Sequence, residues 1–280
     1  GGGYGYNPYV VGKGGSGVVI LAYSTGGLGA RGGGRKYYNS NGKVAHIFNS
    51  SGQFIVEGTK TLTHETLDIF GDSSCKALYQ FEDNANDTSG NYNGTASNIT
   101  YSQGYINQSA IFNGSNGSIT SGFAPQAGTT AATISLWVNF TSYTNSYAVL
   151  AGDNNSGTTA NGFLTLATGA PSSYGSNGHL WVSLGDQSGG YNINTSVSFN
   201  DYGGIGSWIH VAVTVSGTSV SIYMNGTLAT SYTSSISYAP TVNAHNYRFG
   251  YISGWGYLDA KLDQVRFFNK ALSASEVLTL

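Results

Sequence analysis

Oxygen-bearing side chains gather in residues 83–93, which read DNANDTSGNYN. Calcium takes about six to eight oxygen ligands, and a loop that contains Asp87 and Asn91 offers several of them without the ordered spacing of an EF-hand. Asn, Asp, Ser and Gly also dominate ordinary polar turns. The segment therefore predicts either a calcium-binding loop or a structural turn, and the pattern by itself favours the turn.

Asp263 is a second candidate cation ligand, because it stands in an apolar segment. It has the parity of Val265 and Phe267, so a regular strand that buries those two residues also points Asp263 into the core. A buried carboxylate needs a partner. That partner is a set of backbone N–H groups, a basic residue near the strand end (Lys261 or Arg266), or a calcium ion shared with the Asp87 loop. The sequence leaves these three open.

Trp255 is the strongest candidate for contact with a ligand. It lies in residues 251–257, YISGWGY, where the flanking glycines predict an exposed loop. Aromatic rings at exposed positions stack on sugar rings, so Trp255 with Tyr251 and Tyr257 predicts a carbohydrate-binding site. The alternative is a loop side chain that folds back on the domain.

The other tryptophans each stand opposite an apolar stripe, which predicts that they lie on the outer face of a sheet. Such residues form either a platform for a ligand or a small second core beneath a loop, and packing is the favoured interpretation. These residues are Trp137, Trp181 and Trp208.

Motifs for nucleotide binding and catalysis are not convincing. Residues 12–17 satisfy G-x-G-x-x-G, but the VVILAY that follows predicts a strand where the dinucleotide fingerprint requires a helix. The sequence has no Walker loop, no G-x-S-x-G elbow and no H-E-x-x-H. A glycosidase needs two carboxylates facing each other, and the best pair, Asp153 and Asp186, lies in segments that resemble turns. We predict a non-enzymatic protein.

The elements that position these residues must be strands. Of 280 residues only 9% are charged, against roughly 25% in average domains, and 42 are glycine. A net charge of −2 argues against nucleic-acid binding, and the scarcity of Glu, Lys and Arg disfavours helical bundles. Gly, Asn, Thr and Tyr in abundance favour short strands with tight turns. The composition predicts an all-β protein.

Alternating apolar residues support that prediction. Residues 134–140 and 209–215 each place their apolar side chains on one face, and Asn225-Gly226 predicts a two-residue hairpin turn. Strands that recur over some two hundred residues predict a two-sheet antiparallel sandwich or jelly roll. Residues 272–277, LSASEV, predict a short final helix with a serine N-cap and an acid in its first turn.

We divide the chain into a Gly-rich β region (1–62) for anchoring or oligomerisation, a connector (63–76) that includes a helical turn, and the sandwich (77–280). In the first region, residues 43–48 and 53–56 flank NSSG and predict a hairpin. No apolar run approaches the roughly 20 residues of a membrane-spanning helix, and we expect no membrane insertion. The single methionine is Met224, so we expect a processed product or a piece of a longer chain.

Residues 77–280 resemble the laminin-G-like jelly roll of the concanavalin A-like lectin/glucanase superfamily. That resemblance implies two antiparallel sheets and a frequent calcium site near Asp87 to Gly90 and the late Asp263. It leaves function open, since such domains bind sugars, bind proteins or serve as structural modules. Six segments carry it in order: ALYQFEDNANDTSGN (77–91), AIFNG (110–114), ISLWV (134–138), WIHVA (208–212), IYMNG (222–226) and LDQVRFFNKALS (262–273).

The Gly-rich region and the hairpin HIFNSSGQF (46–54) resemble modules of phage tail and appendage proteins, and DIFGDSSC (68–75) is similar to the connector that precedes their laminin-G-like domain. This resemblance implies a tail or head fibre, located at the virion surface or otherwise extracellular, that attaches to host-surface glycans. Other virion proteins and further copies of the chain are expected partners, with trimers common by analogy. The alternatives are a structural decoration or filament subunit, and a secreted bacterial adhesin or carbohydrate-binding module.

Overall fold

The structure, a computed structural model, describes residues 66–143, 147–153, 164–169, 178–186, 190–240 and 244–280, together with the backbone of five strands before residue 58. The chain divides into two compact units, Gly1–Thr63 and His64–Leu280. Among the described residues no helix has the length and apolar character needed to span a membrane.

The first unit contains two small antiparallel sheets. One has the order β1-β4-β3 and the other pairs β2 with β5. The predicted hairpin of residues 43–56 is therefore wrong: both segments are strands, but β4 pairs with β1 and β3 whereas β5 pairs with β2. Residues 12–17 and the start of the connector lie outside the described residues. The bounds are β1 Val19–Ser24, β2 Gly29–Gly32, β3 Arg35–Tyr38, β4 Lys43–Phe48 and β5 Phe54–Glu57.

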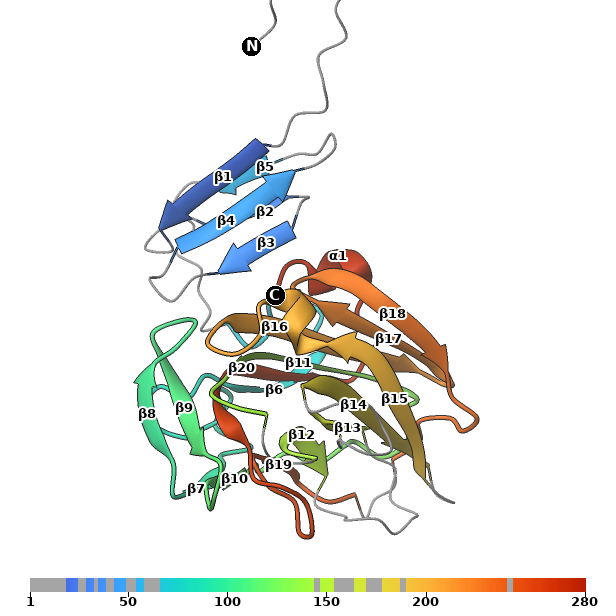
Figure 1. Ribbon diagram of the computed structural model, residues 1–280. Helices are drawn as coiled ribbons and strands as arrows, with labels where there is room; N and C mark the ends of the chain where they lie inside the picture. Colours follow the sequence, from blue (N-terminus) through green and yellow to red (C-terminus); the bar gives the residue numbers. More distant parts are fainter. Residues whose placement is uncertain are drawn as a thin grey trace, which may run out of the picture. The chain divides into compact units, whose positions relative to one another are not determined.

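The second unit is a sandwich of two antiparallel sheets, which confirms the predicted all-β fold (Figure 1). One sheet has seven strands in the order β15-β14-β13-β12-β19-β10-β7. Their bounds are β7 Thr95–Ser97, β10 Ser118–Thr120, β12 Val149–Asp153, β13 Leu164–Thr168, β14 His179–Gly185, β15 Gly190–Ser198 and β19 Tyr247–Phe249.

The other sheet has eight strands, with the order β18-β17-β16-β11-β20-β9-β8 and β6 paired to β20. Their bounds are β6 Cys75–Tyr79, β8 Thr100–Gln103, β9 Gln108–Asn113, β11 Ala131–Phe140, β16 Trp208–Ser216, β17 Ser219–Met224, β18 Thr227–Thr233 and β20 Asp259–Phe268. A 3-10 turn, η1 (Phe199–Tyr202), follows β15.

The predicted apolar stripes form the core between the sheets. Ile134, Leu136 and Val138 of β11 and Ile209, Val211 and Val213 of β16 are buried in one cluster. The Asn225-Gly226 turn joins β17 to β18 with φ of 50° and 79°, the left-handed values that a type I′ hairpin requires. Alternation and turn chemistry therefore place these strands as the sequence predicts.

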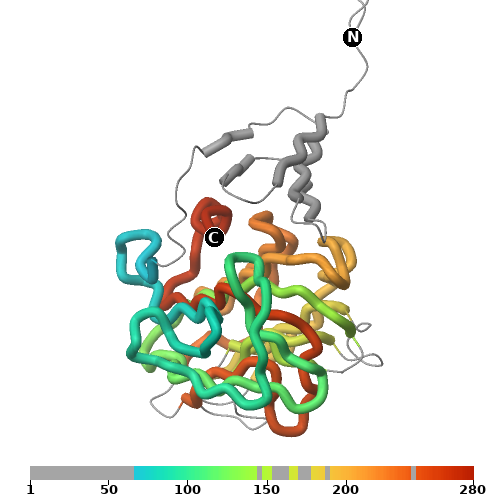
Figure 2. The backbone as a smooth tube through the Cα atoms, turned by 90° about the vertical axis from the view of Figure 1, so that its left-hand side faces the viewer, coloured from blue at the N-terminus to red at the C-terminus, as the bar shows by residue number. Residues whose placement is uncertain are grey.

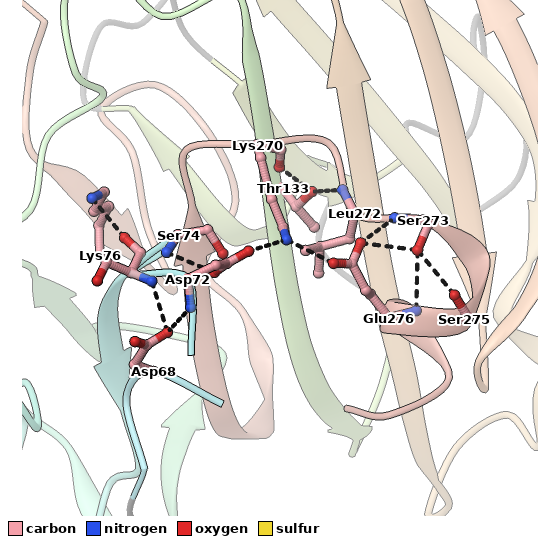
Figure 3. A network of polar contacts seen from close by, with 11 residues as sticks. Asp68, Asp72, Ser74, Lys76, Thr133, Lys270, Leu272, Ser273, Ser275 and Glu276 are labelled. Carbon is pink, nitrogen blue, oxygen red and sulfur yellow. Dashed lines mark hydrogen bonds and ion pairs between the residues drawn. The ribbon is translucent and has the colours of Figure 1, made fainter. Parts of the chain in front are cut away.

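A small second core covers the outer face of the eight-stranded sheet. Helix α1 (Ala274–Val277) has the predicted serine N-cap, Ser273, which also forms a capping box with Glu276. Lys270 joins this helix to the segment before β6, because its Nζ donates to both Asp72 and Glu276 (Figure 3). Figure 2 shows that segment and the C-terminus at the same end of the sandwich. The buried residues of this second core are Cys75, Ala212, Tyr223, Phe268, Leu272 and Val277.

Candidate functional site

An aromatic cluster occupies the outer face of the seven-stranded sheet. Leu180 and Val182 of β14 lie in the core, so Trp181 between them points outward. Tyr147 packs edge-on against Trp181, with ring centroids 5.6 Å apart and an interplanar angle of 75°. Trp255 also packs on Trp181, at 5.1 Å and 76°. We call Tyr147, Trp181 and Trp255 the aromatic cluster.

The loop that carries Trp255 is closed at its neck and lies over the sheet. Leu258 N donates to Gly250 O at 2.8 Å, and Gly250 N donates to Val149 O at 3.0 Å. Gly250 has φ +85°, and a Cβ there would stand 2.2 Å from the Phe112 ring, so only glycine fits. Ile252, inside the loop, is buried against β12. As a result the side chain of Trp255 is half-buried. Its burial is intermediate between the exposed side chain that we predicted and the alternative of a side chain folded back on the domain.

The three predicted sugar-binding residues form two separate ring pairs. Trp255 pairs with Trp181, whereas Tyr251 and Tyr257 stack on each other with centroids 4.0 Å apart and an interplanar angle of 9°. Both tyrosines are half-buried. The loop therefore offers two aromatic surfaces of different geometry.

Asp87 acts as a structural hydrogen-bond acceptor. Its Oδ1 accepts from Leu78 N at 2.8 Å, and its Oδ2 accepts from the hydroxyl of Ser89. The carboxylate is buried. Asn91 is exposed, and its backbone N–H donates to Ser89 Oγ at 3.2 Å. This arrangement matches the structural-turn interpretation of residues 83–93, because the oxygens of Asp87 hold the backbone of that turn.

Asp263 is buried, but not in the core as predicted. Gln264 adopts φ +50° and forms a β-bulge in β20 opposite Leu136, which exchanges the two faces of the strand. Leu262 and Val265, on either side of the bulge, both lie in the core. Asp263 instead lies opposite Trp137 on the outer face, where its exposed fraction is 0%. The parity argument was wrong because it assumed an unbroken alternation.

Residues 104–107 form the loop that buries Asp263. Ile106 N donates to Asp263 Oδ2 at 2.9 Å, and the ring of Tyr105 stacks on Trp137 with centroids 3.5 Å apart. Burial, the largest cause, and the nearby charge of Glu82 together raise the pKa of Asp263 to about 8, although hydrogen bonds from backbone N–H groups act in the opposite direction. Asp263 Oδ1 has no hydrogen-bond partner among the described residues.

The predicted calcium ligands Asp87 and Asp263 have different partners. The acidic neighbour of Asp263 is Glu82, and Asp87 is occupied with its own turn. Within the described part of the chain, no three His, Cys, Asp or Glu residues gather in a way that could hold a metal ion. Calcium at Asp87 and Asn91 stays a prediction from sequence, and the open oxygen of Asp263 near the charge of Glu82 is an acceptor of the kind that calcium takes.

Residues 112–278 match the laminin-G family described as the concanavalin A-like lectin/glucanases superfamily. The chain belongs to this superfamily. A search of curated proteins finds no match to this chain.

Solved structures of this superfamily fold share little sequence with the chain. Domain 4 of AbnA, a GH43 extracellular arabinanase from Geobacillus stearothermophilus solved with arabinotriose, has 22% identity and a TM-score of 0.57 over 74% of this chain and 97% of that domain. The receptor binding domain of botulinum neurotoxin D has 18% identity and a TM-score of 0.55 over 74% of this chain. This chain spans 52% of the toxin domain. At these identities the likeness establishes the fold alone.

A glucanase-type reaction in this superfamily member would need a carboxylate pair. Asp153 ends β12 and Asp186 follows β14, with β13 between them in the sheet. Two strand spacings amount to about 10 Å between backbones. The side chain of Asp153 lies outside the described residues, so the pair stays a prediction from sequence.

Sequence reasoning missed three residues of this superfamily domain: Tyr147, Tyr105 and Glu82. Tyr147 and Tyr105 lie in loops without periodicity, and only the folded chain brings them onto Trp181 and Trp137. Glu82 stands next to the polar segment that we analysed, but nothing in its spacing relates it to Asp263, 181 positions later. The bulge at Gln264 carries no sequence signal that we recognised.

Proposed function

We propose that this chain is a non-enzymatic carbohydrate-binding protein of a virion appendage, a tail or head fibre, that attaches to host-surface glycans. The observation that carries the binding role is the half-buried ring of Trp255, held at a fixed angle on Trp181 at the outer face of the seven-stranded sheet. A ring that is pre-positioned loses little entropy when a sugar stacks on it. Tyr251 and Tyr257 add a second aromatic surface in the same loop.

Support for the appendage comes from the order of the two units. A Gly-rich β unit precedes the sandwich, as in the phage proteins that the sequence resembles. In this proposal the first unit anchors the chain or assembles it with further copies and other virion proteins, and the sandwich presents the ligand site. This placement makes the protein extracellular or virion-surface bound.

The binding role is tested with the full chain and two tryptophan variants on a glycan array and on intact host cells. Trp255→Ala removes the candidate stacking ring, and Trp208→Ala is a matched control because Trp208 is half-buried in the other sheet. We expect Trp255→Ala to lose on the order of tenfold in affinity, by analogy with the about 1–3 kcal/mol that a nucleic-acid base contributes when it stacks on an aromatic ring. Equal binding by Trp255→Ala, with an unchanged circular dichroism spectrum, would refute the site.

A second candidate function is a carbohydrate-binding module of a secreted enzyme or adhesin. The similarity to the whole of the arabinanase domain solved with arabinotriose favours it. The genes beside the coding sequence separate the two candidates, because capsid and tail genes support the fibre and hydrolase domains support the module. Concentration-dependent assembly without any glycan ligand would instead favour a structural decoration subunit.

We propose further that calcium, which the superfamily resemblance implies, is held by Asp263 and Glu82 and not by Asp87 and Asn91. A divalent cation between two carboxylates would keep both ionised and would fill the open oxygen of Asp263. Its role would be structural, since Asp263 also holds the loop of Tyr105.

A further inference from the structure

Arg248 differs from the other basic residues of the second unit. Five Lys and Arg residues lie between His64 and Leu280. The Nε–H of Arg248 is buried and has no hydrogen-bond partner among the described residues. The other four bases donate to described partners: Lys76 to Ser73 O, Lys261 to Gln103 O, Arg266 to Thr66 O, and Lys270 to Asp72 and Glu276.

Arg248 lies on the same outer face as the aromatic cluster. Its neighbours in β19, Tyr247 and Phe249, are both in the core, so the guanidinium points away from it. On one side it is opposite Gly152 of β12, which has no side chain, and Ile252 of the Trp255 loop lies against that glycine. The loop that carries Trp255 therefore runs directly beside Arg248.

On its other side Arg248 meets a patch of hydroxyl groups. Thr120 of β10 is opposite Arg248, and Thr95 of β7 is opposite Thr120. Ser118 and Ser97 form the next pair on the same face, because Ile119 between Ser118 and Thr120 is in the core. Directly opposed residues have Cβ atoms about 4.5–5.5 Å apart. We call Thr95, Ser97, Ser118 and Thr120 the hydroxyl ladder.

The hydroxyl ladder and Arg248 are accessible and carry no negative charge of their own. Thr95 and Ser97 are exposed, and Ser118, Thr120 and Arg248 are half-buried. The sequence from residue 88 to residue 152 contains no Asp, Glu, Lys or Arg. An arginine whose buried Nε–H has lost its hydration without gaining a hydrogen-bond partner favours an anionic ligand.

We propose that Arg248 and the hydroxyl ladder bind the carboxylate-bearing sugar of an acidic glycan. The planar guanidinium matches a carboxylate with two parallel N–H···O bonds, and the ladder supplies donors and acceptors for sugar hydroxyls. One cation balances one carboxylate, whereas a phosphate dianion would leave a surplus charge. This inference rests on the proposed glycan-binding function and adds the class of its ligand. The acidic sugar of the glycan would bind at Arg248, and the rest of the glycan would extend toward Trp255.

The experiment uses the full chain and a panel of uronic- and sialic-acid oligosaccharides, each paired with its carboxyl-reduced form. Binding is measured by calorimetry at low and at physiological salt. We expect the wild type to prefer at least one acidic member over its reduced partner, on the order of tenfold. Arg248→Gln should bring that ratio close to one, and Arg248→Lys should restore it in part, because lysine keeps the charge without the fork.

The matched control is Lys261→Gln, which removes the same charge from β20 in the other sheet and should leave the ratio unchanged. Binding of neutral glycans with no discrimination within any pair would overturn the acidic subsite and leave the proposed function standing. An unchanged preference in a folded Arg248→Gln variant would overturn it as well. Silence toward every glycan would remove the proposed function and this inference together.

Discussion

Trp255 packs edge-on against Trp181, with ring centroids 5.1 Å apart and an interplanar angle of 76°. We expect Trp181→Ala to lower the free energy of unfolding by about 3–5 kcal/mol, because Trp181 is buried beneath the Trp255 loop. Trp255→Ala should cost less, since its ring is half-buried. Urea denaturation of both single variants and the double variant should give a coupling energy of about 0.5–1.5 kcal/mol. Strict additivity would show that the two rings do not support each other.

Gly104 leaves no room for a side chain in the loop over Asp263. A Cβ at residue 104 would stand 2.3 Å from Gln108 O and 2.7 Å from Asp263 Oδ2. We expect Gly104→Ala to lower the free energy of unfolding by about 1–3 kcal/mol, as other overpacking substitutions do. Asn107→Gly in the same loop is the control, because Asn107 has φ +45° and glycine accepts that value without strain. If Gly104→Ala and Asn107→Gly were equally stable, the loop must move to accommodate the methyl group of Ala at residue 104.

Asp263 makes the stability of the calcium-free protein depend on pH. Its pKa rises from an ordinary 3.8 to about 8 on folding, so between these values the folded state holds a proton that the unfolded state has lost. Stability is therefore full below pH 4 and falls as the pH rises to 8. In a chelator, we expect the melting temperature of the wild type to fall over this range more than that of Asp263→Asn. Parallel curves for the two proteins would contradict the assignment.

Added calcium should reverse that loss if Asp263 and Glu82 hold the ion. At pH 8 we expect calcium to raise the melting temperature of the wild type and to leave Asp263→Asn unchanged. Asp87→Asn is the informative control: it should melt earlier because the turn loses an acceptor, but it should keep the calcium response. If Asp87→Asn lost the calcium response and Asp263→Asn kept it, the calcium site would lie in the loop of residues 83–93 instead.

The Lys270 ion pairs should matter at low pH. Hydrogen bonds from Lys270 lower the pKa of Asp72 to about 2 and also lower the pKa of Glu276. Depressed carboxylate pKa values stabilise the fold above the ordinary values, and that contribution is lost as the pH falls through the folded ones. We expect Lys270→Gln to lower the melting temperature slightly at pH 7 and to have a smaller effect near pH 2, where Asp72 is about half protonated. If Lys270→Gln lowered the melting temperature by the same amount at pH 7 and at pH 2, the ion pairs would not be the cause of that change.

Much of the fold was predictable because it depends on local patterns. The stripes at residues 134–140 and 209–215, the Asn225-Gly226 turn and the Ser273 cap each act within a few residues of the chain, and the structure confirms all of them. The predicted hairpin at 43–56 was wrong because strand pairing is not a local property. Two strands that are neighbours in sequence, with a polar link between them, can still pair with other strands.

The candidate site was predictable only in part. Trp181 and Trp137 stand on outer faces, as their parity indicates, but the rings that cover them come from distant loops. Asp263 shows the limit most directly. A single bulge at Gln264 reverses the faces of β20, and the energy of that bulge depends on strands that lie elsewhere in the sequence.

The sequence by itself determined the all-β class, the superfamily and the residue types available for binding, because composition and alternation act on every strand separately. Only the tertiary structure decided which of those residues meet. It placed Trp255 on Trp181, gave Asp263 and Asp87 different hydrogen-bond partners, and positioned Arg248 beside four hydroxyl-bearing residues. Cross-strand register and loop closure depend on the whole sheet at once, so no local pattern contains them.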